Sequence, residues 1–398
     1  MTYIASKAWH CTCNDSRFTI YNVLTGRSYT IAHHIAEVLT FCKTAKAKED
    51  IVAYLNKYIP STSIDATISA LIRKNLLVAD EGEEFIDTIP AHPTLWGCAN
   101  SPNSNTKIVV MGAPFGLGNS IDIRCKDFPT HLRSCVWSYY SFRKLVDNVA
   151  RIDPMTISPW FNRSKFEKII KRNTIVDIGD VIYYCGETSE MFYARMEKIS
   201  EKVLNDGCVP VIIGGDHSIT FSVVSALNKM KTPFIVLHFD AHADMIDGVV
   251  MKLHEQLGNR MINHANVIKS ILGFNNVTHV YQFGVREPLR YDDIKITQYC
   301  VCDINSSKTI KKINELDLPI YITFDVDFFD PSIAPGTASI LPNGGEYGNT
   351  LSFLSQILKH KRILGVDIVE ANPALDTRNQ TTLLVNNLLI QIISQIEI

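Results

Sequence analysis

The sequence has no long hydrophobic run and no strong excess of charge of either sign. Its longest apolar stretch near the C-terminus, residues 383–393, is interrupted by Asn386, Asn387 and Gln391 and is too short to span a membrane. A formal net charge of −2 gives no reason to expect binding to nucleic acid or to a membrane surface. Proline and glycine are not enriched, so the composition is that of an ordinary globular protein with one large domain or more than one.

A secretory signal is also not evident, because residues 1–13 contain no basic region followed by an apolar core. We therefore expect a cytoplasmic protein whose ten scattered cysteines are reduced thiols. The pairs Cys11 with Cys13 and Cys300 with Cys302 could each form half of a metal site. Neither has a second pair at zinc-finger spacing, so we interpret them as ordinary small buried residues.

The stretch at residues 234–244, FIVLHFDAHAD, is the organising feature of the sequence. It opens with an unbroken apolar run of the length and β-branched content expected of a buried parallel strand. Asp240, His242 and Asp244 follow at alternate positions, which share one side of an extended chain. Acidic groups at such an edge are costly to bury unless something positive meets them. A metal site is therefore predicted at the carboxyl end of this strand, where active sites of open α/β sheets lie.

Two other stretches are built in the same way. Residues 209–217, VPVIIGGDH, form an apolar strand that ends in His217, and residues 320–331, IYITFDVDFFDP, form one that carries Asp325 and Asp327. The three strands together supply six candidate ligands: His217, Asp240, His242, Asp244, Asp325 and Asp327. Six are too many for one zinc ion, and the mixture of Asp and His favours a pair of Mn²⁺ ions that share carboxylates. The sequence thus predicts a two-metal hydrolytic centre.

These motifs, GGDHS at residues 214–218, DAHAD at 240–244 and FDVDFFDP at 324–331, resemble the signature motifs of the ureohydrolases, the arginase, agmatinase and formiminoglutamase family. They occur in family order, and the similarity extends from about residue 107 to the C-terminus. The resemblance implies a three-layer α/β/α fold with a central, mostly parallel sheet of roughly eight strands. It also implies that Asp240 and Asp325 bridge the two Mn²⁺ ions. The other ligands would complete the two shells, His217 and Asp244 at one ion and His242 and Asp327 at the other.

The resemblance assigns catalytic and substrate-binding residues as well. Glu370 matches the guanidinium-binding glutamate of the family, and a carboxylate suits bidentate pairing with that planar cation. Asp244 would steady and protonate the tetrahedral intermediate as a guanidinium group is hydrolysed to urea and a primary amine. In the family a loop histidine shuttles a proton at the site mouth. We favour His264 for this role and keep His254 as a substrate-binding candidate.

Residues 1–88 differ in pattern from the rest of the chain. We expect a hairpin over residues 17–31, helices over 32–42, 48–58 and 63–74, and a return strand at 75–78. Such a winged-helix-like α+β module resembles the PqqD-like precursor-recognition domains of ribosomal peptide modification systems. Residues 80–106 are polar, acidic and punctuated by proline, and we expect a linker at 89–106 that leads to a catalytic domain at 107–398.

Two enzymatic hypotheses and one non-enzymatic hypothesis follow. In the first, the protein converts arginine to ornithine within a ribosomally made precursor peptide, because the loop at residues 245–263 lacks the Ser/Thr/Asn-rich stretches with which arginases bind free arginine. In the second, it hydrolyses a small free guanidine such as agmatine, arginine or a formiminoglutamate-like compound, and residues 1–88 are structural. The third is a non-catalytic scaffold, against which the six intact ligands argue. We also expect a homo-oligomer.

Overall fold

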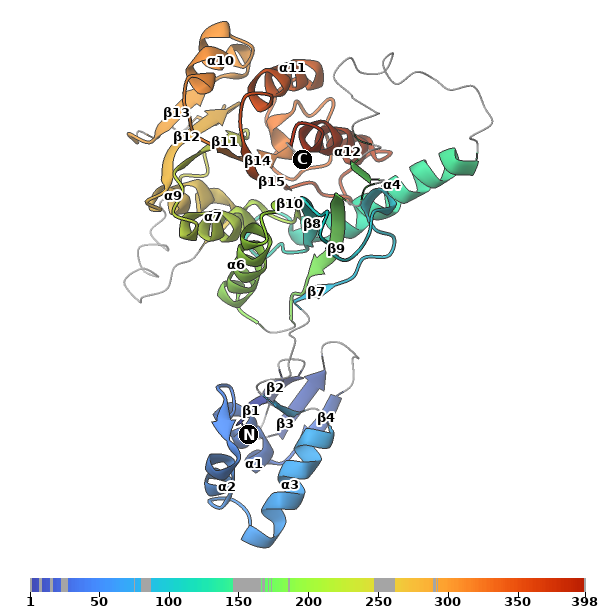
Figure 1. The fold of residues 1–398 in the computed structure, drawn as a ribbon, viewed down its shortest axis with the longest axis vertical. Coiled ribbons are helices and arrows are strands. Elements are labelled where there is room, and N and C mark those ends of the chain that lie inside the picture. Colours follow the sequence, from blue (N-terminus) through green and yellow to red (C-terminus); the bar gives the residue numbers. More distant parts are fainter. Residues whose placement is uncertain are drawn as a thin grey trace. The chain divides into compact units, whose positions relative to one another are not determined.

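The computed structural model divides the chain into two compact units, each described by itself below (Figure 1). The described residues are 2–396 except 7–8, 15–16, 23–27, 75, 80–86, 146–165, 167–168, 171, 173, 185–186, 247–261, 289–290 and 292. The smaller unit comprises Met1–Ile86 with Tyr183–Thr188, and the larger comprises Asp87–Ile182 with Ser189–Ile398.

The larger unit is built on a nine-stranded sheet in the order β13-β12-β11-β14-β15-β10-β8-β9-β7. Its strands are β7 (Thr88–Ile89), β8 (Ile108–Ala113), β9 (Ile175–Val181), β10 (Val209–Gly214), β11 (Phe234–Phe239), β12 (Val277–Phe283), β13 (Ile296–Tyr299), β14 (Ile320–Asp325) and β15 (Ile363–Val369). All neighbours pair in parallel except β7, which is antiparallel to β9. The predicted mostly parallel sheet is confirmed, with one short antiparallel strand beyond the eight expected.

Helices form two groups, which Figure 1 shows on opposite sides of the sheet. One group contains α6 (Ser189–Asn205), α7 (Thr220–Lys229) and α9 (Val267–Leu272). The other contains α4 (Phe128–Leu145), α10 (Ser307–Asn314), α11 (Tyr347–Leu358) and α12 (Gln380–Ile393). Every residue of β8, β11, β14 and β15 is buried, as expected for strands covered on both faces. The three-layer α/β/α architecture is therefore confirmed. Within the described residues, no helix combines the length and apolar character that crossing a membrane requires.

The expected linker at residues 89–106 is instead part of the larger unit. Ile89 lies in β7, and the 3₁₀ turn η1 (Leu95–Gly97) buries Leu95 completely in the core. The backbone N–H of Leu95 donates to Asp177 Oδ2 at 2.8 Å, and Trp96 Nε1 donates to Asn386 Oδ1 at 2.8 Å. The polar composition misled the sequence interpretation, because a few apolar and aromatic side chains are enough to anchor the segment.

The smaller unit contains the hairpin, the three helices and the return strand that its sequence predicts. Its elements are β1 (Thr2–Ala5), β2 (Trp9–Asn14), β3 (Arg17–Asn22), β4 (Ser28–Ile31), α1 (His33–Phe41), β5 (Lys46–Ala47), α2 (Lys48–Leu55), α3 (Ser61–Arg73) and β6 (Leu77–Ala79). They form the sheets β5-β1-β6 and β2-β3-β4. Val38, Ile51, Leu55 and Ile68 are buried in a core of its own, so this unit folds around its own apolar cluster.

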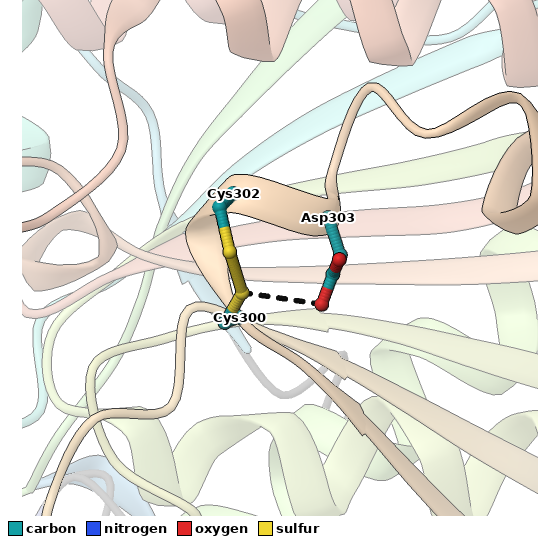
Figure 2. Close-up of a disulfide and its surroundings, with 3 residues drawn as sticks. All are labelled: Cys300, Cys302 and Asp303. Carbon is teal, nitrogen blue, oxygen red and sulfur yellow. Dashed lines mark hydrogen bonds between the residues drawn. A yellow bond between two sulfur atoms is a disulfide. The ribbon is translucent and has the colours of Figure 1, made fainter.

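The cysteine pairs differ from their sequence interpretation, and Cys11 is exposed rather than buried. Cys300 and Cys302 are exposed rather than buried, and they form a disulfide in the 3₁₀ turn η6 (Val301–Asp303) after β13 (Figure 2). The turn brings their Cα atoms to 5.3 Å, which is within the range that a disulfide spans. Cys42, Cys98 and Cys125, in contrast, are buried free thiols, as expected.

Candidate metal centre

The six predicted ligands meet at the carboxyl edge of the sheet. His217 opens the 3₁₀ turn η4 (His217–Ile219) after β10, and Asp240 directly follows β11. Asp325 ends β14, and Asp327 lies in the turn η7 (Val326–Phe328) that follows it. Because β11, β14, β15 and β10 are consecutive in the sheet, their ends converge. Residues separated by more than a hundred positions in sequence thus share one site.

The first cluster is centred on Nδ1 of His217. This nitrogen lies 2.8 Å from Asp244 Oδ2, 3.1 Å from Asp240 Oδ2 and 3.4 Å from Asp325 Oδ2. All four residues are buried. Asp244 has a positive φ of 52°, a conformation that non-glycine residues rarely adopt and that aims its carboxylate at the cluster.

The hydrogen bonds around His217 indicate which of its ring nitrogens is free. The hydroxyl of Thr323 donates to Asp367 Oδ1 at 2.6 Å, so it accepts from Nε2–H of His217 at 2.8 Å. Nδ1 then carries a lone pair. Neither it nor Asp244 Oδ2 forms a hydrogen bond within the described part of the chain, although both atoms are buried. Two electron-rich atoms that face each other at 2.8 Å fit a shared cation, as the predicted metal site requires.

The second cluster contains Asp240, His242 and Asp327. His242 Nδ1 lies 3.0 Å from Asp327 Oδ2 and 3.4 Å from Asp240 Oδ1. Asp240 belongs to both clusters, since its two oxygens face the two different histidines. This arrangement fits the bridging role expected for Asp240. Asp325 adjoins the first cluster through His217.

His238 is a site residue that the sequence interpretation missed. Gln282 Nε2 donates to His238 Nδ1 at 3.0 Å, so Nε2–H of His238 can donate to Asp240 Oδ2 at 2.9 Å. His238 therefore holds Asp240 in place rather than offering a free ligand atom. The alternation of positions 238, 240, 242 and 244 was the available signal, but the partner Gln282 lies on the neighbouring strand β12.

The pKa values of Asp325, Asp327 and His242 are raised in this site. Burial, together with the charge of Asp240, raises the pKa of Asp327 to about 7. Burial and the neighbouring Asp327 and Asp240 also raise the pKa of Asp325 well above its ordinary value. Burial opposes the charged form of His242, but hydrogen bonds to Asp240 and Asp327 outweigh it and raise the pKa of His242 to about 12. Bound cations would displace these protons.

Glu370, the candidate guanidinium ligand, directly follows β15 with a positive φ of 65°. Asn119 Nδ2 donates to its Oε2 at 2.7 Å, and the backbone N–H of His217 donates to its Oε1 at 2.9 Å. The carboxylate is thus fixed by one metal-site residue and by the loop after β8. The sequence did not single out Asn119, because nothing local relates it to a residue 251 positions away.

His264, the favoured one of the two loop histidines, lies at the site. Its Nδ1 is 3.6 Å from Glu370 Oε1, and its Nε2 accepts from the backbone N–H of Ser120 at 3.3 Å. Burial disfavours the charged form of His264, but Glu370 outweighs this and raises its pKa. His254 lies outside the described residues.

Close packing around Gly118 positions this part of the site. A Cβ at Gly118 would lie 2.5 Å from Ser218 Oγ and 2.8 Å from Asp216 Oδ1, so only glycine fits there. Its N–H donates to Asp216 Oδ2 at 2.7 Å, and its carbonyl accepts from the N–H of His264 at 3.1 Å. The loop after β8 therefore joins the β10 end to the segment that carries His264.

A cavity of about 390 Å³ opens above these residues. The buried His217, Asp325 and Glu370 lie at its floor. Exposed side chains surround its mouth, among them Ile121 and Ile340. The cavity is large enough for a small guanidino group and its alkyl chain, and it brings that group directly to the clustered ligands.

Comparison with known proteins agrees with this geometry. A sequence model of the arginase family matches residues 106–394. The chain therefore belongs to the arginase family.

Relatives within the family have names that refer to different guanidino substrates. The chain is 27% identical over 292 residues to an agmatinase from Citrobacter koseri. The aligned region covers 71% of this chain and 84% of the relative. It is 28% identical over 254 residues to the mitochondrial guanidino acid hydrolase of Homo sapiens. The aligned region covers 60% of this chain and 68% of the relative. The solved structure of an agmatine ureohydrolase from Thermoplasma volcanium is similar with a TM-score of 0.56 at 25% identity, covering 75% of this chain and 93% of that one.

Removal of either proposed bridging carboxylate is expected to abolish metal binding. Asp240→Ala and Asp325→Ala would each remove a carboxylate proposed to hold both ions. Elemental analysis of the purified variants should therefore find little or no Mn²⁺, against about two ions per chain in the parent protein. Asp293→Ala, an exposed aspartate outside both clusters, is the control and should retain both ions. Full Mn²⁺ occupancy in either bridging variant would contradict the assignment.

The stabilisation that Mn²⁺ provides is expected to grow between about pH 5 and 7. In the metal-free protein, Asp325 and Asp327 have raised pKa values, so the folded chain binds more protons than the unfolded chain and loses stability as pH rises. The raised pKa of His242 acts in the same direction. Bound Mn²⁺ would require the deprotonated ligands and would remove this loss. Calorimetric melting with Mn²⁺ and with a chelator checks the difference, and a gain that shrinks over this range would count against it.

Proposed function

We propose that this chain hydrolyses a guanidinium group to urea and a primary amine at a pair of Mn²⁺ ions, and that its substrate is an arginine side chain within a ribosomally made precursor peptide. The observation that carries the chemistry is the position of Glu370, whose carboxylate is fixed beside the clustered ligands and lines the same cavity. A carboxylate can pair with a planar guanidinium through charge-assisted hydrogen bonds. The site therefore combines a carboxylate that binds the guanidinium group with a hydrolytic metal centre.

Each residue of the site has a defined task in this reaction. When bound, two divalent ions lower the pKa of water so that hydroxide is available at neutral pH. Glu370 orients the guanidinium so that its central carbon faces the ligand cluster, which removes much of the orientational cost. Asp244 receives the proton from the attacking water and passes it to the alkyl nitrogen, whose bond to the central carbon then breaks. His264, at the cavity wall beside Glu370, is a second proton carrier for the departing amine.

A peptide substrate is supported by the smaller unit. Its elements between residues 2 and 79 pack around their own core, so the unit is a separate module with its own fold. The strand β4 is at the edge of a three-stranded sheet, and an exposed edge can accept an extended peptide as an added strand. The family match begins at residue 106, so the activity of the family does not account for this module.

Hydrolysis of a small free guanidine is the second candidate function. It is favoured by the similarity to an agmatinase and to a guanidino acid hydrolase, whose names refer to small guanidino compounds. In that case the smaller unit would be structural or would promote the homo-oligomer that we expect.

Replacement of Glu370 by glutamine is expected to leave the metal site loaded while turnover falls. Glu370→Gln keeps the size of the side chain but removes the charge that pairs with the guanidinium, so kcat/KM for urea release should fall about a hundredfold. Glu346→Gln, at an exposed position before α11, is the matched control and should retain the parent rate. Unchanged turnover in Glu370→Gln would show that another group holds the guanidinium.

Deletion of the smaller unit distinguishes the two candidate functions. The deletion should end at residue 86, since β7 (Thr88–Ile89) belongs to the catalytic sheet. If the unit binds the precursor, its removal lowers kcat/KM for a full-length precursor by about tenfold or more, while a short arginine peptide loses little. Circular dichroism and Mn²⁺ content establish first that the truncated chain is folded. Equal losses on both substrates would assign a structural role, and turnover of agmatine or free arginine alone would support the second candidate.

A further inference from the structure

The mouth of the catalytic cavity is lined by three exposed isoleucines, which we call the isoleucine collar. Ile121, Ile246 and Ile340 line the cavity, and their side chains are 62%, 42% and 53% exposed. The proposed metal ligands that line the same cavity are buried except for the half-buried His242, so exposure increases from floor to mouth. Large apolar side chains that are grouped at the entrance to a site remain in water until something covers them.

Each collar residue is held by a group that also builds the site. The N–H of Ile121 donates to Asn119 Oδ1 at 2.7 Å, and Asn119 also binds Glu370. The N–H of Ile246 donates to the carbonyl of Ala265, the residue next to His264, at 2.9 Å.

Ile340 has an equivalent anchor. It precedes Leu341, whose carbonyl accepts from Arg286 Nη2 at 2.8 Å. The same guanidinium nitrogen donates to the carbonyl of Asp327, a proposed metal ligand, at 2.8 Å. The collar is therefore fixed relative to Glu370 and the ligands by hydrogen bonds, and it presents a preorganised apolar rim.

The described residues that line the cavity include few groups that could bind the α-carboxylate of a free amino acid. Apart from the three histidines near the ligand cluster, no basic side chain lines the cavity among the described residues. The hydroxyl of Ser120 already contacts His264 Nε2 at 3.0 Å. Glu287 adds a further carboxylate to the wall, which repels a free α-carboxylate. An arginine whose carboxyl group is part of a peptide bond does not carry that charge.

We propose that the isoleucine collar is a specificity subsite for apolar side chains that are adjacent to the target arginine in a peptide. The inference rests on the proposed guanidinium hydrolysis, and it names the neighbouring residues that the same site prefers. The arginine side chain enters the cavity toward Glu370, and the residues before and after it lie across the mouth. There, aliphatic neighbours cover Ile121, Ile246 and Ile340 and remove apolar surface from water.

Binding energy from these neighbours also improves the reaction itself. Contacts remote from the reacting carbon hold the guanidinium in position and so lower the barrier to its hydrolysis. Partial burial of one leucine side chain on the collar is worth about a tenfold change in kcat/KM, which corresponds to about 1.4 kcal/mol. The effect should be specific to apolar neighbours.

Two capped tripeptides test the subsite with the full-length protein loaded with Mn²⁺. One has leucine on both sides of the arginine and the other has serine, and urea release measures kcat/KM for each. The parent protein should prefer the leucine peptide by about tenfold. Ile121→Ser, Ile246→Ser and Ile340→Ser should each reduce this preference ratio several-fold. Because these side chains are exposed, the substitutions are not expected to disturb folding, which Mn²⁺ content and melting temperature verify.

Ile294→Ser is the matched control, since Ile294 is 96% exposed and lies outside the cavity lining. It should leave the preference ratio unchanged. Equal kcat/KM for the two peptides in the parent protein overturns the collar proposal alone, because guanidinium hydrolysis in a peptide would still be demonstrated. A preference that persists in all three collar variants also overturns it. Absence of urea from both peptides, with Mn²⁺ bound and agmatine or free arginine hydrolysed, overturns the peptide substrate and the collar together.

Discussion

The burial of several carboxylates at one edge of a parallel sheet is the constraint on which the catalytic unit depends. Asp240, Asp325 and Asp327 are almost completely buried, and ionised carboxylates in such surroundings are costly unless cations meet them. Parallel strands supply the convergence, because their carboxyl ends meet at one edge. Hydrogen bonds then fix which atom of a side chain faces the cluster. Thr323, for example, accepts from Nε2–H of His217 and so leaves Nδ1 facing the carboxylates. Metal binding and the folding of this edge are therefore linked.

Glu370, the proposed guanidinium ligand, connects the clustered ligands to the loop at the cavity mouth. Its two oxygens accept from Asn119 and from the backbone of His217, and His264 lies against it. Asn119 in turn holds the N–H of Ile121 at the cavity mouth. The residues that would bind the guanidinium, carry protons and contact neighbouring groups are thus parts of one hydrogen-bonded framework. A displacement of the loop after β8 would change all three properties at once.

The boundary of the catalytic unit does not coincide with the match to its family. The match begins at residue 106, whereas the compact unit begins at Asp87 and includes β7 and η1. The preceding segment therefore extends the catalytic sheet by an antiparallel edge strand. The smaller unit packs around a separate apolar core.

The role proposed for Glu370 comes from the resemblance to the family. The strands, the clustering of the six proposed ligands and the small N-terminal module were predictable from the sequence. Each depends on a local pattern, such as the apolar run that precedes Asp240 or the alternation that follows it. The roles of Asn119, His238 and Thr323, and the inclusion of residues 89–106 in the catalytic unit, depended on the tertiary structure. These features consist of contacts between residues that are far apart along the chain. Local sequence determines which groups are available at a strand end, but only the packed sheet determines which of them meet.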